Sequence, residues 1–145
     1  MEIKIKKTNI YAKTPKRGSD YAAGYDLYFA SGYDAVIEPH KTVMLGTGIA
    51  AEIPEGYFGA IFARSGLASK RGLRPSNCVG VVDCDYRNEI MVALHNDTDE
   101  EQIVGGGERI AQLVILPYQN LEFTEVKELS QTIRGLGGFG STGEK

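Results

Sequence analysis

Short strand-like runs, separated by glycine and proline, fill this chain and restrict the folds open to it. Apolar residues alternate with lysines at Ile3 and Ile5, as in a half-buried first strand. Further runs typical of strands follow at 22–30, 35–38, 42–53, 57–63, 89–95, 105–116 and 123–126. No amphipathic run reaches the length of roughly twelve residues expected of an ordinary helix. The sequence therefore predicts an all-β fold, either a sandwich or a barrel.

One segment, 64–72, breaks the strand pattern. It offers Ser65 as an N-cap, about two or three helical turns, and Gly72 as a C-terminal stop. A helix start carries free N–H groups and Arg64 adds a fork of donors beside it, so this point suits a phosphate. Every helix needs a start, however, and a purely structural interpretation stays open.

Length, composition and charge favour an ordinary globular enzyme or binding domain. At 145 residues, with 42% hydrophobic and 24% charged residues, the chain can form one domain around a single core. A net charge of -3 gives no reason to expect a nucleic-acid partner. Apolar runs fall short of the ~20 residues of a membrane span, and the alternating N-terminus differs from a signal peptide, so we expect a cytoplasmic protein without a membrane partner. Cys78 and Cys84 match neither a zinc pattern nor a disulfide framework, which predicts two reduced thiols.

The stretch 77–90 is the most informative part of the chain. Its β-branched first half and its alternating last residues flank a polar turn, which predicts a β-hairpin. The turn places the carboxylate of Asp83 and the ring of Tyr86 three residues apart, where an acid reaches a ligand that a ring covers. Asp is also common in turns for conformational reasons alone, so that alternative stays open.

Two further polar residues interrupt otherwise apolar strands. Asp26 is costly to bury without a partner; it either bonds the neighbouring backbone or lies near a metal-bound water. Gln112 is the lone polar residue of a buried strand and must be satisfied by some hydrogen-bond partner.

The segment 134–143 contains five glycines in ten residues and is unable to pack a core. Glycine lets backbone N–H groups approach a phosphate closely, and Phe139 supplies a flat face for a base. Holding such a chain in place costs about 1–2 kcal/mol per residue of backbone entropy, which a multiply charged ligand would offset. The alternative is a flexible end; the order of a Walker loop is absent.

Five short segments, which follow one another along nearly the whole chain, form one combined pattern. They are Ala23-Gly24-Tyr25-Asp26-Leu27, Arg64-Ser65-Gly66-Leu67-Ala68, Gly80-Val81-Val82-Asp83-Cys84-Asp85-Tyr86-Arg87, Gly107-Glu108-Arg109-Ile110-Ala111-Gln112-Leu113 and Arg134-Gly135-Leu136-Gly137-Gly138-Phe139-Gly140-Ser141-Thr142-Gly143. Together they closely resemble the five motifs of the homotrimeric dUTPases, which hydrolyse dUTP to dUMP and pyrophosphate. Two residues depart from the family pattern, with Asn88 in place of the usual glycine and Glu108 where Asp is frequent. Because Asn tolerates a left-handed backbone, we expect the turn at Asn88 to survive.

The resemblance implies a jelly-roll-like β fold and a homotrimer with three shared sites. One chain would supply the segments around Asp26, Arg64 and Gln112, a second chain the predicted hairpin, and a third the tail. We therefore expect a β-barrel domain at 1–128 and a flexible arm at 129–145 that closes over a neighbouring subunit's site.

The resemblance also implies roles for individual residues. Asp83 would bond the 3′-hydroxyl and orient the water that attacks the α-phosphorus, and Tyr86 would lie against the deoxyribose. Phe139 would stack over the uracil. Further residues would bind the substrate, at the uracil pocket, the phosphates or the closing arm: Arg64, Ser65, Gly66, Asn77, Gly80, Val82, Met91, Gln112, Arg134, Gly140 and Ser141.

The implied cofactor is Mg²⁺, held mostly by the phosphates and water, with Asp26 one water away. A dCTP deaminase is a rival interpretation that would need Glu89 to serve a water attacking the base, and it leaves the tail unexplained. A zinc deaminase is excluded because its His-x-Glu and Pro-Cys-x-x-Cys patterns are absent. A third alternative is a nucleotide-gated binding protein, which has no need for a carboxylate at Asp83.

Overall fold

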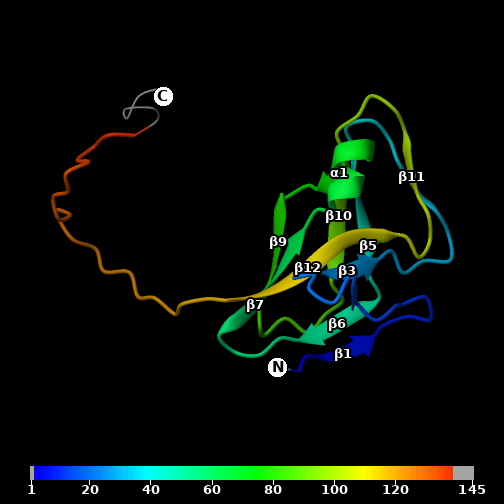
Figure 1. The fold of residues 1–145 in the computed structure, drawn as a ribbon, viewed down its shortest axis with the longest axis horizontal. Helices are drawn as coiled ribbons and strands as arrows, with labels where there is room; N and C mark the ends of the chain where they lie inside the picture. Colours follow the sequence, from blue (N-terminus) through cyan, green and yellow to red (C-terminus); the bar gives the residue numbers. More distant parts are fainter. Residues whose placement is uncertain (1, 139–145) are drawn as a thin grey trace.

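The computed structural model describes residues 2–138, and strands with a single short helix make up the regular structure of that part (Figure 1). The strands are β1 (Lys4–Lys7), β2 (Lys16–Arg17), β3 (Tyr25–Tyr28), β4 (Ala35–Ile37), β5 (Thr42–Gly46), β6 (Ile49–Glu52), β7 (Tyr57–Phe62), β8 (Leu73–Pro75), β9 (Val79–Val82), β10 (Met91–Asn96), β11 (Gln102–Val104) and β12 (Arg109–Pro117); the helix is α1 (Ser65–Arg71). The predicted all-β, jelly-roll-like fold is confirmed.

Antiparallel sheets surround one apolar core. The largest sheet has the strand order β2-β3-β12-β7-β9, and a second has the order β5-β10-β8; β1 pairs with β6 and β4 with β11. The alternate residues of these strands point inward, as the two-residue period of a strand requires. The core is formed by apolar side chains from all the sheets, among them Leu27, Ile37, Leu45, Ile61, Leu94, Ile110 and Leu113.

The predicted hairpin at 77–90 is wrong in its pairing, although both flanking strands exist. β9 pairs with β7, whereas β10 pairs with β5 and β8, so the turn carries the chain from one sheet to another. Val82 before the turn and Ile90 after it are both buried in the common core. Each strand thus finds its partner in its own sheet, which local sequence patterns do not specify.

Two other predicted strands differ in the structure. The run 42–53 is divided into β5 and β6 by Thr47, which is fully buried, and Gly48, whose φ of 68° is left-handed. The run 123–126 forms no strand, because the described chain after β12 leaves the barrel and meets no sheet edge (Figure 1). Phe123 within it is 97% exposed.

The helix lies one residue away from its predicted start. Arg64, with an extended backbone, is the N-cap and makes no side-chain capping bond, so Ser65 is the first helical residue and not the cap. Gly72 ends the helix as predicted, in the left-handed conformation with φ 61°. Buried Leu67 fixes the helix to the core.

Two findings on residues 2–138 concern membrane-spanning helices and the cysteines. Over that range, the structure contains no helix with the length and apolar character needed to cross a membrane. Cys78 and Cys84 are both free thiols, as predicted.

Candidate active site

Asp26 and Arg64 meet at one end of the five-stranded sheet. Asp26 on β3 lies opposite Gln112 on β12, which in turn lies opposite Phe62 on β7, and Arg64 follows two residues later. Arg64 Nε donates to Asp26 Oδ1 at 2.8 Å, and Arg109 Nη1 donates to Oδ2 at 3.2 Å. The partners of Asp26 are therefore arginines, and the alternative of a backbone-bonded carboxylate is wrong. One acid facing two guanidinium groups leaves a net positive cluster, which favours an anionic ligand.

Gln112 is satisfied, as its position in the strand requires. Its Nε2 donates to the backbone oxygen of Ala63 at 2.9 Å and so fixes the residue that precedes Arg64. Gly24 makes room for this side chain, because a Cβ at Gly24 would lie 2.4 Å from Gln112 Oε1. Gly24 and Gln112 therefore act as one packing unit beneath the positive cluster.

Arg109 was missed as a site residue by sequence reasoning. A β-bulge between Arg109 and Ala111 inserts one extra residue into β12, so that Arg109 lies opposite Tyr28 while Gln112 lies opposite Asp26. Residues 26 and 28 share a face of β3, and Arg109 and Gln112 therefore share that face as well. A regular strand would have placed them on opposite faces, and the sequence gives no signal for the bulge apart from the preceding glycines.

Glu108, the departure from the family pattern, has a structural role. Its Oε2 accepts from the backbone N–H of Gly105 at 3.0 Å, and its Oε1 accepts from Arg71 at the end of α1. The side chain thereby connects the glycine turn before β12 to the helix that follows Arg64.

Ser65 and Gly66 are exposed at the first turn of α1 beside this cluster. N–H groups in the first turn of a helix have no partner within the helix. A Cβ at Gly66 would meet nothing within 4 Å, so packing inside this chain does not require glycine there. The position therefore leaves room for another group to approach the backbone closely.

A second group of predicted residues lines a small cavity between β9 and β10. The cavity measures about 150 Å³, below the ~300 Å³ at which drug-sized pockets begin, so it suits a single small ring. β9 is the last strand of its sheet, which leaves the main-chain groups of its outer edge without a strand partner in this chain. The predicted residues that line this cavity are Asn77, Gly80, Val82 and Met91.

Asp83 and Tyr86 lie in the turn that follows this cavity. Asp83 is exposed, and its backbone oxygen accepts from Tyr86 N–H at 3.2 Å. The Tyr86 hydroxyl donates to the backbone oxygen of Glu89 at 2.9 Å. The turn at Asn88 is formed without a left-handed backbone there, since the non-glycine residues with positive φ in the described chain are His40 and Cys78. Asn88 Oδ1 accepts from Glu89 N–H at 2.8 Å.

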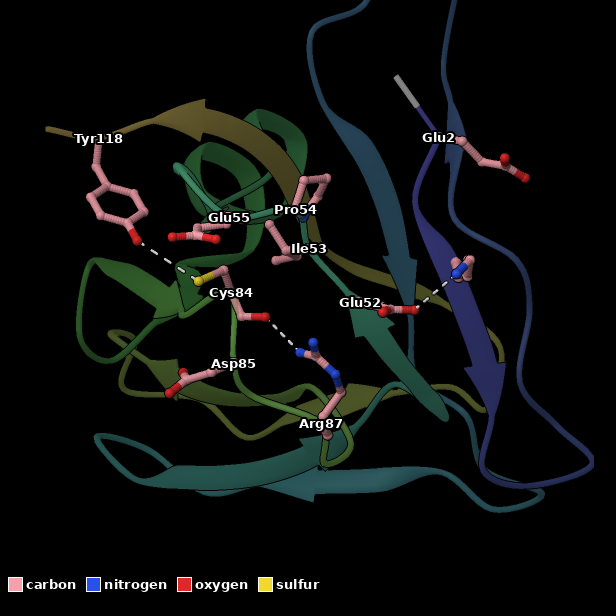
Figure 2. A pocket seen from close by; sticks show the side chains of 10 residues that line it. Glu2, Glu52, Ile53, Pro54, Glu55, Cys84, Asp85, Arg87 and Tyr118 are labelled. Carbon is pink, nitrogen blue, oxygen red and sulfur yellow. Dashed lines mark hydrogen bonds and ion pairs between the residues drawn. The ribbon is translucent and has the colours of Figure 1, made fainter. Parts of the chain in front are cut away.

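A further cavity of about 520 Å³, on the far side of the turn, contains none of the predicted site residues. Figure 2 shows Cys84, Asp85, Arg87 and Tyr118 at its wall, among acids from β6 and the N-terminus. The hydrogen bond between the Cys84 thiol and the Tyr118 hydroxyl, at 3.8 Å, raises the pKa of Tyr118 above its ordinary value. Its lining contains four acids against Lys4 and Arg87, and this net negative charge disfavours a nucleotide.

The two groups of site residues lie far apart within one chain. Val82 pairs with Gly59 and Val79 with Phe62, so the register brings Asp83 to the level of Phe58, six residues before Arg64 along β7. At ~3.3 Å per residue, this separation is about 20 Å. A single chain therefore does not bring the carboxylate of Asp83 to the arginine cluster.

The part of the tail that the structure describes, up to Gly138, makes no hydrogen bond or ion pair with either group. Arg134 is exposed, and its Nε donates to the backbone oxygen of Gly137 at 2.9 Å, within the tail itself. Phe139, Gly140 and Ser141 lie outside the described residues. Apolar side chains between the barrel and Gly138 face solvent: Leu121, Phe123, Leu129, Ile133 and Leu136 are 67–110% exposed.

Comparison with known proteins gives one consistent family. The dUTPase family model matches residues 10–143. The chain is 48% identical over 145 residues to the deoxyuridine 5′-triphosphate nucleotidohydrolase of Hydrogenobaculum sp., covering 100% of both chains. It is 48% identical over 144 residues to the enzyme of the same name from Nautilia profundicola, covering 99% of this chain and 100% of the relative.

Solved structures agree with these sequence matches. The dUTPase of Staphylococcus bacteriophage 80alpha with dUpNHpp has a TM-score of 0.85 and 31% identity, with 98% of each chain covered. The dUTPase from phage phi11 of S. aureus has a TM-score of 0.82 and 26% identity, with 91% of this chain and 100% of the other covered. Sequence motifs, fold and full-length matches coincide, and the chain therefore belongs to the dUTPase family.

Proposed function

We propose that this protein hydrolyses dUTP to dUMP and pyrophosphate in a site shared between subunits of a homotrimer. The observation that carries the shared site is the distance of about 20 Å between the levels of Asp83 and Arg64 along β7. A base-sized cavity with its carboxylate occupies one end of the chain, and a cluster of cations occupies the other. A neighbouring copy supplies the missing half of each site.

The cavity beside β9 selects uracil. The free main-chain groups of β9, with Asn77, bond the edge of the base, and cytosine is rejected because its donor and acceptor are exchanged. Val82 and Met91 line the wall, where the close packing excludes the methyl group of thymine. Phe139 of the tail stacks over the base from outside.

Asp83 orients the attacking water. Its carboxylate bonds the 3′-hydroxyl of the sugar and holds a water in line with the α-phosphorus. A carboxylate is a weak base toward water, so positioning of the water contributes more than proton abstraction. Tyr86 lies against the deoxyribose and leaves no room for a 2′-hydroxyl.

Arg64, Ser65, Gly66 and Gln112 hold the α- and β-phosphates, and Arg134, Gly140 and Ser141 of the tail hold the γ-phosphate. Mg²⁺, when bound with the substrate, would neutralise phosphate charge, and Asp26 would hold it through a water. Among the described residues, no group of three or more His, Cys, Asp or Glu side chains gathers. The phosphates and water would therefore supply most of the ligands in this proposal.

The deaminase alternative would need Glu89 for a second task. Its carboxylate already accepts from the backbone N–H of Gly48 at 2.8 Å and from the Thr8 hydroxyl at 2.9 Å. In this structure Glu89 thus joins two chain segments, which favours a structural role over service to a water that attacks a base.

The substrate assignment is tested by pyrophosphate release from dUTP with magnesium, beside dCTP, dTTP and UTP. We expect release from dUTP alone, and a fall in kcat of about 10²–10⁴-fold in Asp83→Asn. Binding of dUTP without pyrophosphate release would contradict hydrolysis and favour the nucleotide-gated binding protein.

The shared site is tested by mixing two inactive variants, Asp83→Asn and Arg64→Ala, and allowing subunits to exchange. Each mixed trimer contains one site with an unaltered Asp83 from the Arg64→Ala chain and an unaltered Arg64 from the Asp83→Asn chain, so activity returns. If mixing restores nothing while gel filtration shows exchange, both residues act within one chain and the shared site is wrong.

A further inference from the structure

Glu89 lies at a junction of three chain segments. Its Oε1 accepts from the backbone N–H of Gly48, and its Oε2 accepts from the Thr8 hydroxyl. Thr8 and Gly48 are also bonded to each other, since Thr8 N–H donates to Gly48 O at 2.8 Å. One side chain thus connects the end of the Tyr86 turn to the segments after β1 and between β5 and β6.

The segment around Gly48, to which the Glu89 side chain is bonded, is tightly packed. Gly48 has a left-handed φ of 68°, and a Cβ there would lie 2.6 Å from Ala12 Cβ and 2.8 Å from Ala30 Cβ. Ile90, the next residue after Glu89, donates its N–H to Ile49 O at 2.8 Å. The exit of the turn is therefore attached to a closely packed part of the barrel, which has little freedom to move.

Tyr86 depends on this attachment. Its ring is 40% exposed, and the hydroxyl at the far end of the ring donates to the backbone oxygen of Glu89 at 2.9 Å. Since the turn before Tyr86 is exposed from Asp83 onward apart from half-buried Cys84, the bond to Glu89 is the contact that locates the end of the ring. The Tyr86 ring excludes an extra hydroxyl group only if the ring stays in place. A misplacement of about 1 Å is enough to change a rate about a hundredfold.

We propose that Glu89 is a positioning residue that sets the selectivity for deoxyribose over ribose. The inference rests on the role of Tyr86 under the proposed function. The carboxylate holds the turn exit against Gly48 and Thr8, the backbone oxygen of Glu89 holds the Tyr86 hydroxyl, and the ring then excludes the 2′-hydroxyl of UTP. Glu89 touches no reacting atom, and its effect passes through Tyr86.

The test compares kcat/KM for dUTP with kcat/KM for UTP in the full-length protein. Glu89→Ala removes both carboxylate bonds and is expected to lower the dUTP/UTP ratio roughly tenfold or more, with kcat for dUTP within about threefold of the wild type. Glu89→Gln keeps an acceptor for Gly48 N–H and a donor for the Thr8 oxygen, so its ratio stays within about twofold of the wild type. Glu101→Ala, which alters an exposed acid on the β10–β11 loop, is the matched control and leaves the ratio unchanged.

Two comparison variants keep every outcome decisive. Tyr86→Ala is expected to lower the ratio at least as far as Glu89→Ala; an unchanged ratio there would show that the role of Tyr86 itself is wrong. A ratio that falls in Tyr86→Ala but not in Glu89→Ala would overturn the inference alone, as would loss of dUTP turnover in Glu89→Gln, which indicates a chemical role for the carboxylate. If Glu89→Ala does not fold, Thr8→Val decides, because loss of that one bond lowers the ratio by a smaller factor in the same direction, and no change there rejects the inference.

Discussion

At the scale of single residues, the Asp26 carboxylate forms two ion pairs. Its side chain is 12% exposed and holds both Arg64 and Arg109, whose side chains are 23% and 50% exposed. The more exposed guanidinium keeps donors free toward solvent, while the less exposed one is oriented by the carboxylate. The acid thus prepares two cations for an anion before the ligand arrives, which lowers the cost of ordering them on binding.

Asp26→Asn tests this arrangement. The neutral amide leaves two guanidinium groups without a countercharge, so we expect a loss of roughly 1–3 kcal/mol in the free energy of unfolding and a higher magnesium concentration for half-maximal turnover. Urea denaturation and a magnesium titration of pyrophosphate release measure the two effects. Asp20→Asn, on an exposed turn, serves as control, and equal effects in both variants would contradict a specific role for Asp26.

At the scale of elements, the contact between β12 and the residue before β3 depends on a glycine that leaves space for a side chain of β12. Gly24 precedes β3, and the space above it is filled by Gln112 from β12. Because Gln112 also holds Ala63, the position of the segment leading into α1 follows from this contact.

Gly24→Ala should therefore weaken substrate binding without unfolding the protein. The new methyl group displaces the end of a flexible side chain rather than backbone, so we expect KM for dUTP to rise roughly tenfold or more with a nearly unchanged melting temperature. Gly18→Ala is the matched control, since a Cβ at Gly18 meets nothing within 4 Å. Steady-state kinetics and thermal unfolding of both variants decide, and an unchanged KM in Gly24→Ala would show that Gln112 does not need its present position.

The secondary-structure elements also show how much of this structure the sequence alone predicts. The two-residue period of the strands and the glycine at the end of α1 are local, and both predictions are confirmed. Whether β9 pairs with β10 depends on contacts between distant segments, and that prediction was wrong. Asn77, Gly80, Val82 and Met91, which line the cavity beside β9, were named from motif resemblance, whereas Arg109 was missed because a single-residue bulge decides its face.

At the scale of the whole molecule, the described chain after β12, residues 118–138, carries apolar side chains that its own barrel leaves exposed. Full burial of Phe123 or Leu129 against a partner would stabilise an assembly by about 1.5–3 kcal/mol for each side chain. The described tail runs away from the barrel (Figure 1), which suits a segment that docks on another copy.

Removal of residues 134–145 should separate assembly from catalysis. We expect the shortened protein to sediment, like the full chain, at about three times the 15.8 kDa chain mass, with a nearly unchanged melting temperature and no turnover of dUTP. The physical reason is that this segment supplies ligand contacts but no core. A monomeric mass for the full chain at micromolar concentration would contradict the trimer, and loss of the trimer only on truncation would show that the segment is structural.

The separation of Asp83 from Arg64 along β7 also has a genetic consequence. In the proposed trimer, a subunit altered at one of these positions would spoil one site, because it contributes that residue once. A subunit altered at both spoils two sites with two different neighbours. Co-expressed with the normal gene, the doubly altered allele is therefore the more dominant of the two, although either alteration alone already inactivates a pure trimer.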